Sequence, residues 1–395
     1  GSEMCIRDSL EAADGAETTQ PAISFRFNKA IDEEVFRRAL KLTQKGLGQP
    51  AFFNDDINIS RVLANGCNDI EEARDYGILG CVEASVCGKS DFRPVAGFIN
   101  ILKILEVTMH DGVDPNGNYQ FGPHTGKMED MTSMEQFMEA YKKQLAFAID
   151  YHLQAYGICS SLHSLIAPTV FASTTVDDCI EKGRILQKDG AKYSTTGTFI
   201  SGVANAADSL AAIDQVCFQQ KLMTLAEMRD MLDSNYAGKE EWHQMLLNKY
   251  VHFGNDSDLV DDYCRQVVTF CAKENQAHKD SRFGQYELIL LNQTYNSWQG
   301  RVVGATPDGR MAGEPLANNA SPSNGMDRNG PTAVGNSIGK MDTLMVPKGV
   351  LVNHKFDPAV AKGEKGLDML ETFVRGYMEA GGQHVQINVV DAKTL

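Results

Sequence analysis

The sequence is short of basic residues: its 395 residues include 37 Lys and Arg against 52 Asp and Glu, a formal net charge of −15. An acidic surface repels the phosphates of nucleic acids and the headgroups of anionic lipids. No apolar run approaches the roughly 20 residues that a membrane-spanning helix needs. Since 43% of the residues are hydrophobic and 23% are charged, the composition is that of a folded globular protein. We therefore expect a cytoplasmic protein that binds neither nucleic acid nor membranes.

Several common motifs of catalysis and metal binding are missing. The chain contains no C-x-x-C, no H-E-x-x-H and no G-x-G-x-x-G, which argues against zinc ribbons, thioredoxin-like sites, zinc proteases and dinucleotide-binding folds. The run Cys87–Ser90 (CGKS) resembles the end of a phosphate-binding loop. That loop needs a glycine five residues before Gly88, and the position holds Glu83, whose carboxylate would repel phosphate. We expect no metal site in the chain.

The cysteines are odd in number and widely spaced. A secretory signal is lacking, so they are expected to be free thiols in a reducing compartment. They are Cys5, Cys67, Cys81, Cys87, Cys159, Cys179, Cys217, Cys264 and Cys271.

The first nine residues (GSEMCIRDS) resemble a translated sequencing adapter rather than the start of a gene. We therefore exclude them from fold reasoning and take residues 1–20 as an artefact or a disordered lead-in. Residues 21–395 show no shift in composition and no low-complexity linker. They are expected to form one domain.

Apolar residues at helical spacing predict helices over residues 31–44, 134–148, 224–232, 259–270 and 367–378. Two of these follow capping-box patterns, Thr132 with Glu135 and Thr224 with Glu227. Strands are predicted at 76–79, 350–352 and 384–390. Helices that alternate with short strands indicate an α/β fold, although periodicity does not distinguish an open sheet from a barrel.

The run Gly80–Glu83 (GCVE) follows the predicted strand at 76–79. In an extended segment, residues two apart point to the same face, so the thiol of Cys81 and the carboxylate of Glu83 could address one ligand. A buried structural cysteine beside a solvated glutamate is the simpler alternative, because free cysteine often acts as a small core residue. The spacing alone leaves both interpretations open.

Eight segments resemble the glycyl radical enzymes of the pyruvate formate-lyase superfamily, and they follow the order of that family across the chain. They are Pro21–Lys29, Gly46–Asp56, Glu71–Glu83, Gly202–Leu210, Gly304–Arg310, Pro315–Pro322, Gly330–Ala333 and Gln383–Asp391.

This resemblance implies that the fold is part of a ten-stranded α/β barrel made of two five-stranded halves that run antiparallel to each other. It also implies that Cys81 forms a thiyl radical from a stored glycyl radical, and that Glu83 acts as a base. Water-poor surroundings would raise the pKa of Glu83. Because Val82 replaces a second cysteine, the pattern resembles the dehydratase, lyase and decarboxylase branches rather than the acyl-transferring one.

The chain departs from the family in one respect. The glycyl radical motif R-V-x-G-Y is expected after Asp391, but the printed sequence ends at Leu395. The similar run at 301–305 (RVVGA) lies too early in the chain. We therefore expect a fragment that lacks the glycyl radical loop and the N-terminal half of the pocket, and that is inactive alone.

Residues 88–115 look most similar to the trans-4-hydroxyproline dehydratases, in which an aromatic hydroxyl lies near the position of Phe98. Phe98 lacks this hydroxyl, so it is either a core residue or the sign of a different substrate, and the resemblance makes it a candidate substrate-binding residue. Hydroxyproline is therefore the leading substrate, ahead of glycerol or propane-1,2-diol and of arylacetate decarboxylation. The resemblance implies anaerobic metabolism, a homodimer and a separate activating enzyme that uses S-adenosylmethionine and an iron–sulfur cluster. A decayed, non-catalytic barrel that serves as a binding partner is the alternative of another class.

Overall fold

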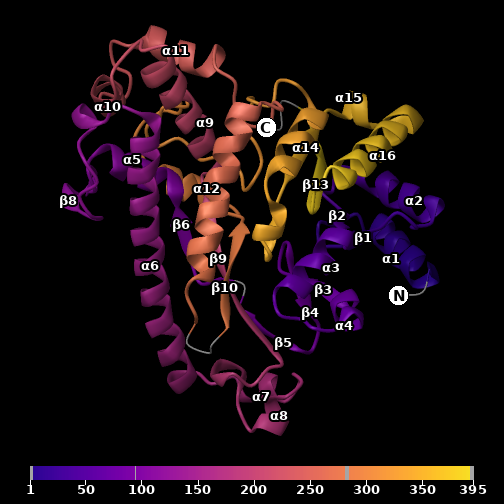
Figure 1. Cartoon of the computed structure of the whole chain (residues 1–395). Coiled ribbons are helices and arrows are strands. Elements are labelled where there is room, and N and C mark those ends of the chain that lie inside the picture. Colours follow the sequence, from indigo (N-terminus) through magenta and orange to yellow (C-terminus); the bar gives the residue numbers. More distant parts are fainter. Residues whose placement is uncertain (1–2, 94, 281–283, 392–395) are drawn as a thin grey trace.

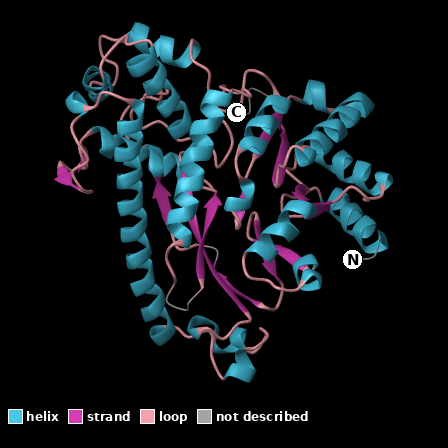
Figure 2. Ribbon diagram, viewed as in Figure 1, coloured by secondary structure: helices cyan, strands magenta, loops and turns pink. Residues whose placement is uncertain are grey.

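The computed structural model describes residues 3–93, 95–280 and 284–391. Two β-sheets lie at its centre, and helices pack on their outer sides (Figure 1; Figure 2). One sheet is wholly parallel, with the strand order β11-β10-β9-β5. Its fifth strand, β6, lies on the same side of β9 as β5: β5 pairs with the first half of β9 and β6 with its last three residues. Its strands are β5 (Ser90–Arg93), β6 (Phe98–Asn100), β9 (Tyr193–Ser201), β10 (Gln285–Leu290) and β11 (Gly349–Val350).

The second sheet has the order β1-β2-β13-β12. Its outer pairs are parallel, and β2 and β13 are antiparallel. Its strands are β1 (Ser24–Phe27), β2 (Ala51–Asn54), β12 (Asn353–Phe356) and β13 (His384–Val389). Two separate hairpins complete the strands: β3 (Tyr76–Leu79) with β4 (Glu83–Val86), and β7 (Val113–Asp114) with β8 (Tyr119–Gln120).

The predicted strand at 350–352 is divided between the two sheets. Val350 ends β11, and β12 begins at Asn353 in the other sheet. Leu351 donates its N–H to the carbonyl of Leu290 in β10, and Val352 accepts a hydrogen bond from Gln386 in β13. The segment is extended as predicted, but it forms the connection at which the chain passes from one sheet to the other.

The helices are α1 (Glu3–Ala16), α2 (Glu33–Thr43), α3 (Asp55–Ala64), α4 (Ile70–Arg74), α5 (Ile101–Met109), α6 (Met134–Ile166), α7 (Val170–Ser173), α8 (Cys179–Lys182), α9 (Val203–Ile213), α10 (Leu225–Asp233), α11 (Glu240–Asn248), α12 (Asp258–Gln276), α13 (Tyr295–Gly300), α14 (Pro331–Lys340), α15 (Pro358–Ala361) and α16 (Gly363–Glu379). Each of the five predicted helices is present. The long α6 runs well past its predicted end at residue 148.

Side-chain caps explain where these helices begin. The carboxylate of Asp32 accepts the N–H of Val35 at the start of α2, and Thr224 and Glu227 form the predicted capping box of α10. The box predicted at Thr132 is one residue off. The N-cap of α6 is Ser133, whose hydroxyl accepts the N–H of Gln136.

Within residues 1–20, Glu3–Ala16 form the helix α1, where a disordered lead-in was one of the two expectations. Leu10 in α1 is 2% exposed and belongs to the main apolar core, and Arg7 forms an ion pair with Glu34 of α2. Gly1 and Ser2 lie outside the described residues. The origin of the first nine residues and the domain limits at 21–395 stay predictions.

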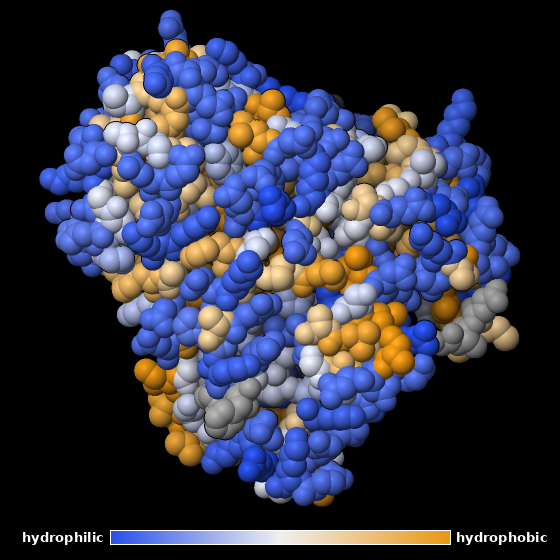
Figure 3. Space-filling model, in the orientation of Figure 1, coloured by the Kyte–Doolittle hydropathy of each residue, from blue (hydrophilic) through white to orange (hydrophobic). Residues whose placement is uncertain are grey.

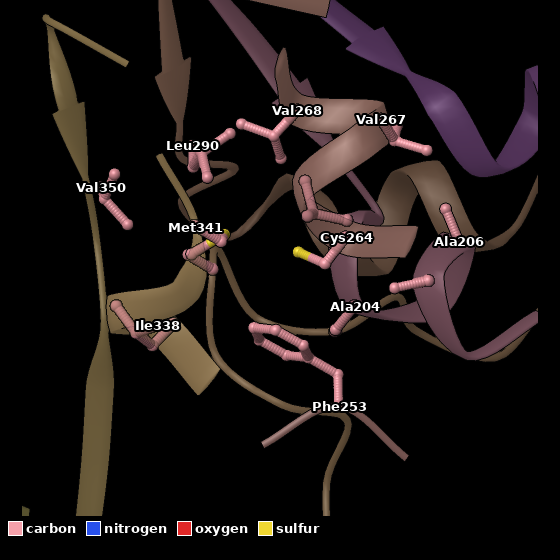
Figure 4. Close-up of a cluster of buried hydrophobic side chains, with 14 of the residues drawn as sticks. Ala204, Ala206, Phe253, Cys264, Val267, Val268, Leu290, Ile338, Met341 and Val350 are labelled. Carbon is pink, nitrogen blue, oxygen red and sulfur yellow. The ribbon is translucent and has the colours of Figure 1, made fainter. Parts of the chain in front are cut away.

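The register of the parallel sheet places four residues in one row: Phe98, Phe199, Ile289 and Gly349 pair directly across neighbouring strands. Neighbouring residues along each strand point the other way. Figure 4 shows Leu290 and Val350 directed towards side chains of α9, α12 and α14. The row therefore faces away from these helices, towards the interior between the two sheets.

No helix within the described ranges is long and apolar enough to span a bilayer. The face of the molecule seen in Figure 3 is largely hydrophilic, in keeping with the excess of acidic residues.

Candidate active site

Cys81 lies in the three-residue turn Gly80–Val82, which joins β3 to β4. Gly80 has a φ of +62°, a conformation that favours glycine, and a Cβ added there would lie 3.0 Å from Oε2 of Glu83. The i, i+2 spacing suggested that Cys81 and Glu83 share one strand, but they do not. The cysteine occupies the tip of a hairpin, and the glutamate is the first residue of the returning strand.

The carboxylate of Glu83 folds back beneath this turn. Its Oε2 atom accepts the backbone N–H of Cys81 at 2.9 Å and that of Val82 at 2.8 Å. Both of these bonds go to Oε2, and no hydrogen bond to Oε1 from another residue is found among the described residues. Thiol and carboxylate are thus joined through the backbone that carries them.

Val82 inserts into a small apolar cluster to which both sheets contribute (Figure 1 shows the hairpin beside them). Its buried members are Phe53, Val82, Phe199, Ile289, Leu291 and Leu351. A Cβ on Gly349 would lie 2.5 Å from Cγ2 of Val82, so the hairpin tip fits against the strand only because this position is glycine. The cysteine loop therefore reaches the interior between the sheets.

Gln383 fixes the other side of Val82. This fully buried side chain donates from Nε2 to the carbonyl of Val82 at 3.3 Å and to Oδ1 of Asn58 at 2.8 Å. Its Oε1 atom accepts the N–H of Val350 at 2.6 Å. The amide side chain thus ties the hairpin tip to α3 and to the connection between the two sheets.

The base of the hairpin is held by a second polar group. Oδ1 of Asp55 accepts the hydroxyl of Tyr76 and Nε of Arg26, both at 2.7 Å, and the guanidinium of Arg26 lies 4.0 Å above the ring of Tyr76. These residues join β1, the first turn of α3 and β3. The hairpin is therefore anchored at both ends.

The electrostatics suit a base close to a thiol. Glu83 is 3% exposed, and burial raises its pKa, while the two turn amides and the charge of Lys348 partly offset that rise. Cys81 is exposed at the tip, yet desolvation and then the charge of Glu83 raise its thiol pKa. A carboxylate with a raised pKa is better matched to proton transfer near neutral pH.

Phe98 lies on the interior row described above. Its ring centroid is 4.9 Å from that of Phe199 and 4.8 Å from that of Tyr295, and it packs against the cluster that contains Val82. The structure therefore brings all three predicted site residues, Cys81, Glu83 and Phe98, to one region.

The supporting residues were not identified from the sequence. Gln383 and Gly349 contact the hairpin from roughly 270 to 300 residues further along the chain. Gln383 opens a segment that carries the family resemblance, and this was the available signal. Periodicity does not reveal a side chain that acts through backbone groups of another segment.

Other motifs do not form sites. Gly335–Gly339 has the spacing of a G-x-S-x-G nucleophile elbow, but it lies inside α14, where Ser337 is buried and accepts the N–H of Asp256. In the part of the chain that the structure describes, no group of three or more His, Cys, Asp or Glu residues could hold a metal ion.

Two family models match the chain: "Pyruvate formate lyase-like" over residues 8–300 and "Glycine radical" over residues 316–395. The chain belongs to the pyruvate formate lyase-like glycyl radical enzymes. Among its relatives in this family, the trans-4-hydroxy-L-proline dehydratase of Clostridioides difficile is 35% identical over 98% of this chain and 48% of its own. The (2S)-3-sulfopropanediol dehydratase of Klebsiella oxytoca is 29% identical over 98% of this chain and 47% of its own.

Solved structures of glycyl radical enzymes share the fold. The B12-independent glycerol dehydratase of Clostridium butyricum matches with a TM-score of 0.94 at 38% identity, over 98% of this chain and 48% of that one. The C. difficile hydroxyproline dehydratase gives the same TM-score at 35% identity, over the same shares of the two chains. The expected α/β fold, part of the barrel of this family, is therefore confirmed. The chain spans about half the length of the relatives it matches.

Proposed function

We propose that this chain supplies the cysteine hairpin of a glycyl radical dehydratase that cleaves a C–O bond in a small hydroxylated molecule. One observation carries the proposal: an exposed thiol and a buried carboxylate lie on one turn, with one carboxylate oxygen held by the turn itself and the other left for a ligand. This arrangement suits paired transfer of a hydrogen atom and a proton.

The glycyl radical, when present, supplies the oxidation that removes the hydrogen atom of the Cys81 thiol. The accessible position of this thiol at the hairpin tip fits that role. The sulfur of Cys81 then takes a hydrogen atom from the substrate carbon next to the one that bears the leaving hydroxyl group, which forms an S–H bond and leaves a carbon radical.

Glu83 takes a proton on its Oε1 atom from the group on the radical carbon: the hydroxyl in glycerol or propane-1,2-diol, and the protonated ring nitrogen in trans-4-hydroxyproline, which has a single hydroxyl. The deprotonated radical expels the neighbouring hydroxyl group as hydroxide, and the proton held by Glu83 converts the hydroxide to water. The product radical finally takes the hydrogen atom back from Cys81, which restores the thiyl state. Surroundings poor in water, as the burial of Glu83 indicates, favour both transfers.

Similarity to a hydroxyproline dehydratase and to a glycerol dehydratase supports the choice of reaction. Val82 occupies the position where acyl transfer would need a second thiol, and its side chain is buried in the apolar cluster. We propose trans-4-hydroxyproline as the first substrate to test, followed by glycerol and propane-1,2-diol. The partners are an activating enzyme that uses S-adenosylmethionine and an iron–sulfur cluster, and a second copy of the chain; the proposed location is the anaerobic cytoplasm.

The test uses the full gene product that carries these residues, treated with such an activating enzyme under anaerobic conditions. Electron paramagnetic resonance measures the glycyl radical, and mass spectrometry follows dehydration of the three substrates. A radical signal with turnover of one substrate is expected. Absence of both would favour the non-catalytic alternative, and a radical without dehydration would favour another radical reaction.

A further inference from the structure

The wall that faces the cysteine hairpin is almost wholly apolar. Phe98, Phe199 and Ile289 form its interior row, and Leu291 and Leu351 belong to the same cluster. A hydroxylated substrate held between the hairpin tip and the Phe98 end of this row meets polar groups at the hairpin end, from Cys81 and Glu83. It needs a second polar contact to fix its far end, since apolar contacts alone do not orient a small polar molecule.

Tyr295 lies at that far end. It begins α13, five residues beyond the end of β10, and its ring stacks in a tilted arrangement on Phe98 with the centroids 4.8 Å apart. Its side chain is 47% exposed, and within residues 3–93, 95–280 and 284–391 its hydroxyl makes no hydrogen bond. A phenol with a free hydroxyl is thus placed directly beside the aromatic end of the interior row.

The spacing suits a small molecule. Phe98 and Gly349 are three strand spacings apart, roughly 14 Å between Cα positions, and the side chains at each end fill part of that span. Val82 covers Gly349, and Tyr295 covers Phe98. Between them, Phe199 and Ile289 are fully buried, so a ligand on this wall contacts Phe98 and Tyr295 rather than the middle of the row.

We propose that Tyr295 is a substrate-binding residue that determines specificity: its hydroxyl donates a hydrogen bond to a carboxylate or hydroxyl oxygen on the substrate end remote from Cys81. This inference rests on the proposed function and adds to it a second, oxygen-bearing end of the substrate. Phe98 has no hydrogen-bonding group, so the polar contact on this wall comes from the neighbouring ring.

The test compares Tyr295→Phe with the double variant Phe98→Tyr/Tyr295→Phe in the full gene product. Tyr295→Phe removes only the hydroxyl, and the double variant returns it on the adjacent ring. Trp298→Phe, at an exposed aromatic residue of the same helix that stacks with Arg301, is the matched control. Calorimetry before activation measures the Kd of trans-4-hydroxyproline, glycerol and propane-1,2-diol, and kinetics after activation measure KM and kcat.

For the probe that the parent protein binds, Tyr295→Phe is expected to raise Kd and KM about tenfold, the effect of one lost hydrogen bond to ligand. The value of kcat should stay within about twofold, and the double variant should regain most of the binding. A carboxylate contact would show itself as an effect on hydroxyproline alone, and a hydroxyl contact as an effect on the diols.

The two proposals fail differently. Turnover with an unchanged Kd in Tyr295→Phe would overturn the role of Tyr295 and leave the dehydratase intact. If substrate binding depends on Tyr295 but no turnover occurs, the proposed dehydratase function is overturned and the proposed contact between Tyr295 and the substrate stands. A parent protein that binds none of the three probes would overturn both.

Discussion

The two turns at the ends of β4 hold the same residue types in very different surroundings. The turn before it carries Gly80 and Cys81, and the turn after it carries Cys87 and Gly88. Both glycines have a positive φ, +62° and +70°, and both cysteines are exposed.

What separates the turns is what lies around each one. At the first turn, Val82 packs between the two sheets and the backbone of Cys81 rests on the carboxylate of Glu83. The turn at Cys87 lies outside them, and the following Lys89 forms an ion pair with Glu72 at 2.8 Å. Neither the residue type nor the exposure of a thiol marks the site, because both are shared. The buried carboxylate and the fitted enclosure distinguish it, and the predictions that follow test this difference.

Replacing Cys81 and Cys87 separately by alanine should give the largest difference in turnover between the two turns. Cys81→Ala should bring turnover of the activated full gene product below detection and leave the glycyl radical signal in place, since the thiol acts after radical storage. Cys87→Ala, the matched control, should retain turnover within about twofold, as most surface substitutions have little effect. Full activity in Cys81→Ala would exclude the thiol from the reaction.

Removal of the carboxylate charge should have the next largest effect. Glu83→Gln keeps an oxygen for the two turn amides but removes the base, so kcat is expected to fall about 10²- to 10⁴-fold. In the parent enzyme, the base is active only when deprotonated, and its pKa is raised above the ordinary 4.5 by burial. Hence kcat/KM should decline as pH falls through that raised value, and a pH profile without an acidic limb above 4.5 would contradict the assignment.

The substitution Gly349→Ala tests the close contact between β11 and Val82 at the hairpin tip. The added Cβ would lie 2.5 Å from Cγ2 and 2.9 Å from the carbonyl oxygen of Val82, at a φ of +145°. We expect a loss of about 1–3 kcal/mol in the free energy of unfolding, the usual cost of overpacking. Gly376→Ala in α16 is the control, because nothing lies within 4 Å of that position, and a gain of roughly 0.5–1 kcal/mol is expected.

Urea unfolding of this chain followed by circular dichroism measures both variants of that pair. In a double-mutant cycle, Val82→Ala should cost less free energy of unfolding in the Gly349→Ala background than in the parent, because it removes the clashing methyl groups. Equal stability of Gly349→Ala and the parent would show that the tip does not fit against β11 as described.

The smallest expected effect is on thiol reactivity. The charge of Glu83 contributes to the raised pKa of Cys81, so Glu83→Gln should increase the thiolate fraction at pH 8. Alkylation of Cys81 by iodoacetamide, followed by peptide mass spectrometry, should become about two- to fivefold faster. The rate at Cys87 in the same sample serves as the reference and should not change.

The sequence predicted the helices with clear apolar stripes, the α/β class and the three residues that the structure brings together. The reasoning that placed Cys81 and Glu83 on one face of a strand was wrong, because Gly80 turns the chain and the carboxylate returns to the turn amides. Gln383 could not be assigned from pattern. Its contacts to Asn58 and Val82 span 325 and 301 residues, and local periodicity contains no information on such separations.

The two hydrogen bonds from the turn to Oε2 of Glu83 have a mechanical consequence. A displacement of the hairpin tip carries the thiol and the carboxylate together, because the same three residues provide both groups and the bonds between them. The enclosure can therefore open to admit a substrate or release a product while the spacing between hydrogen-atom acceptor and proton acceptor is preserved. The distance between the thiol and the carboxylate is therefore determined by the hairpin alone. It does not depend on how closely the surrounding sheets pack.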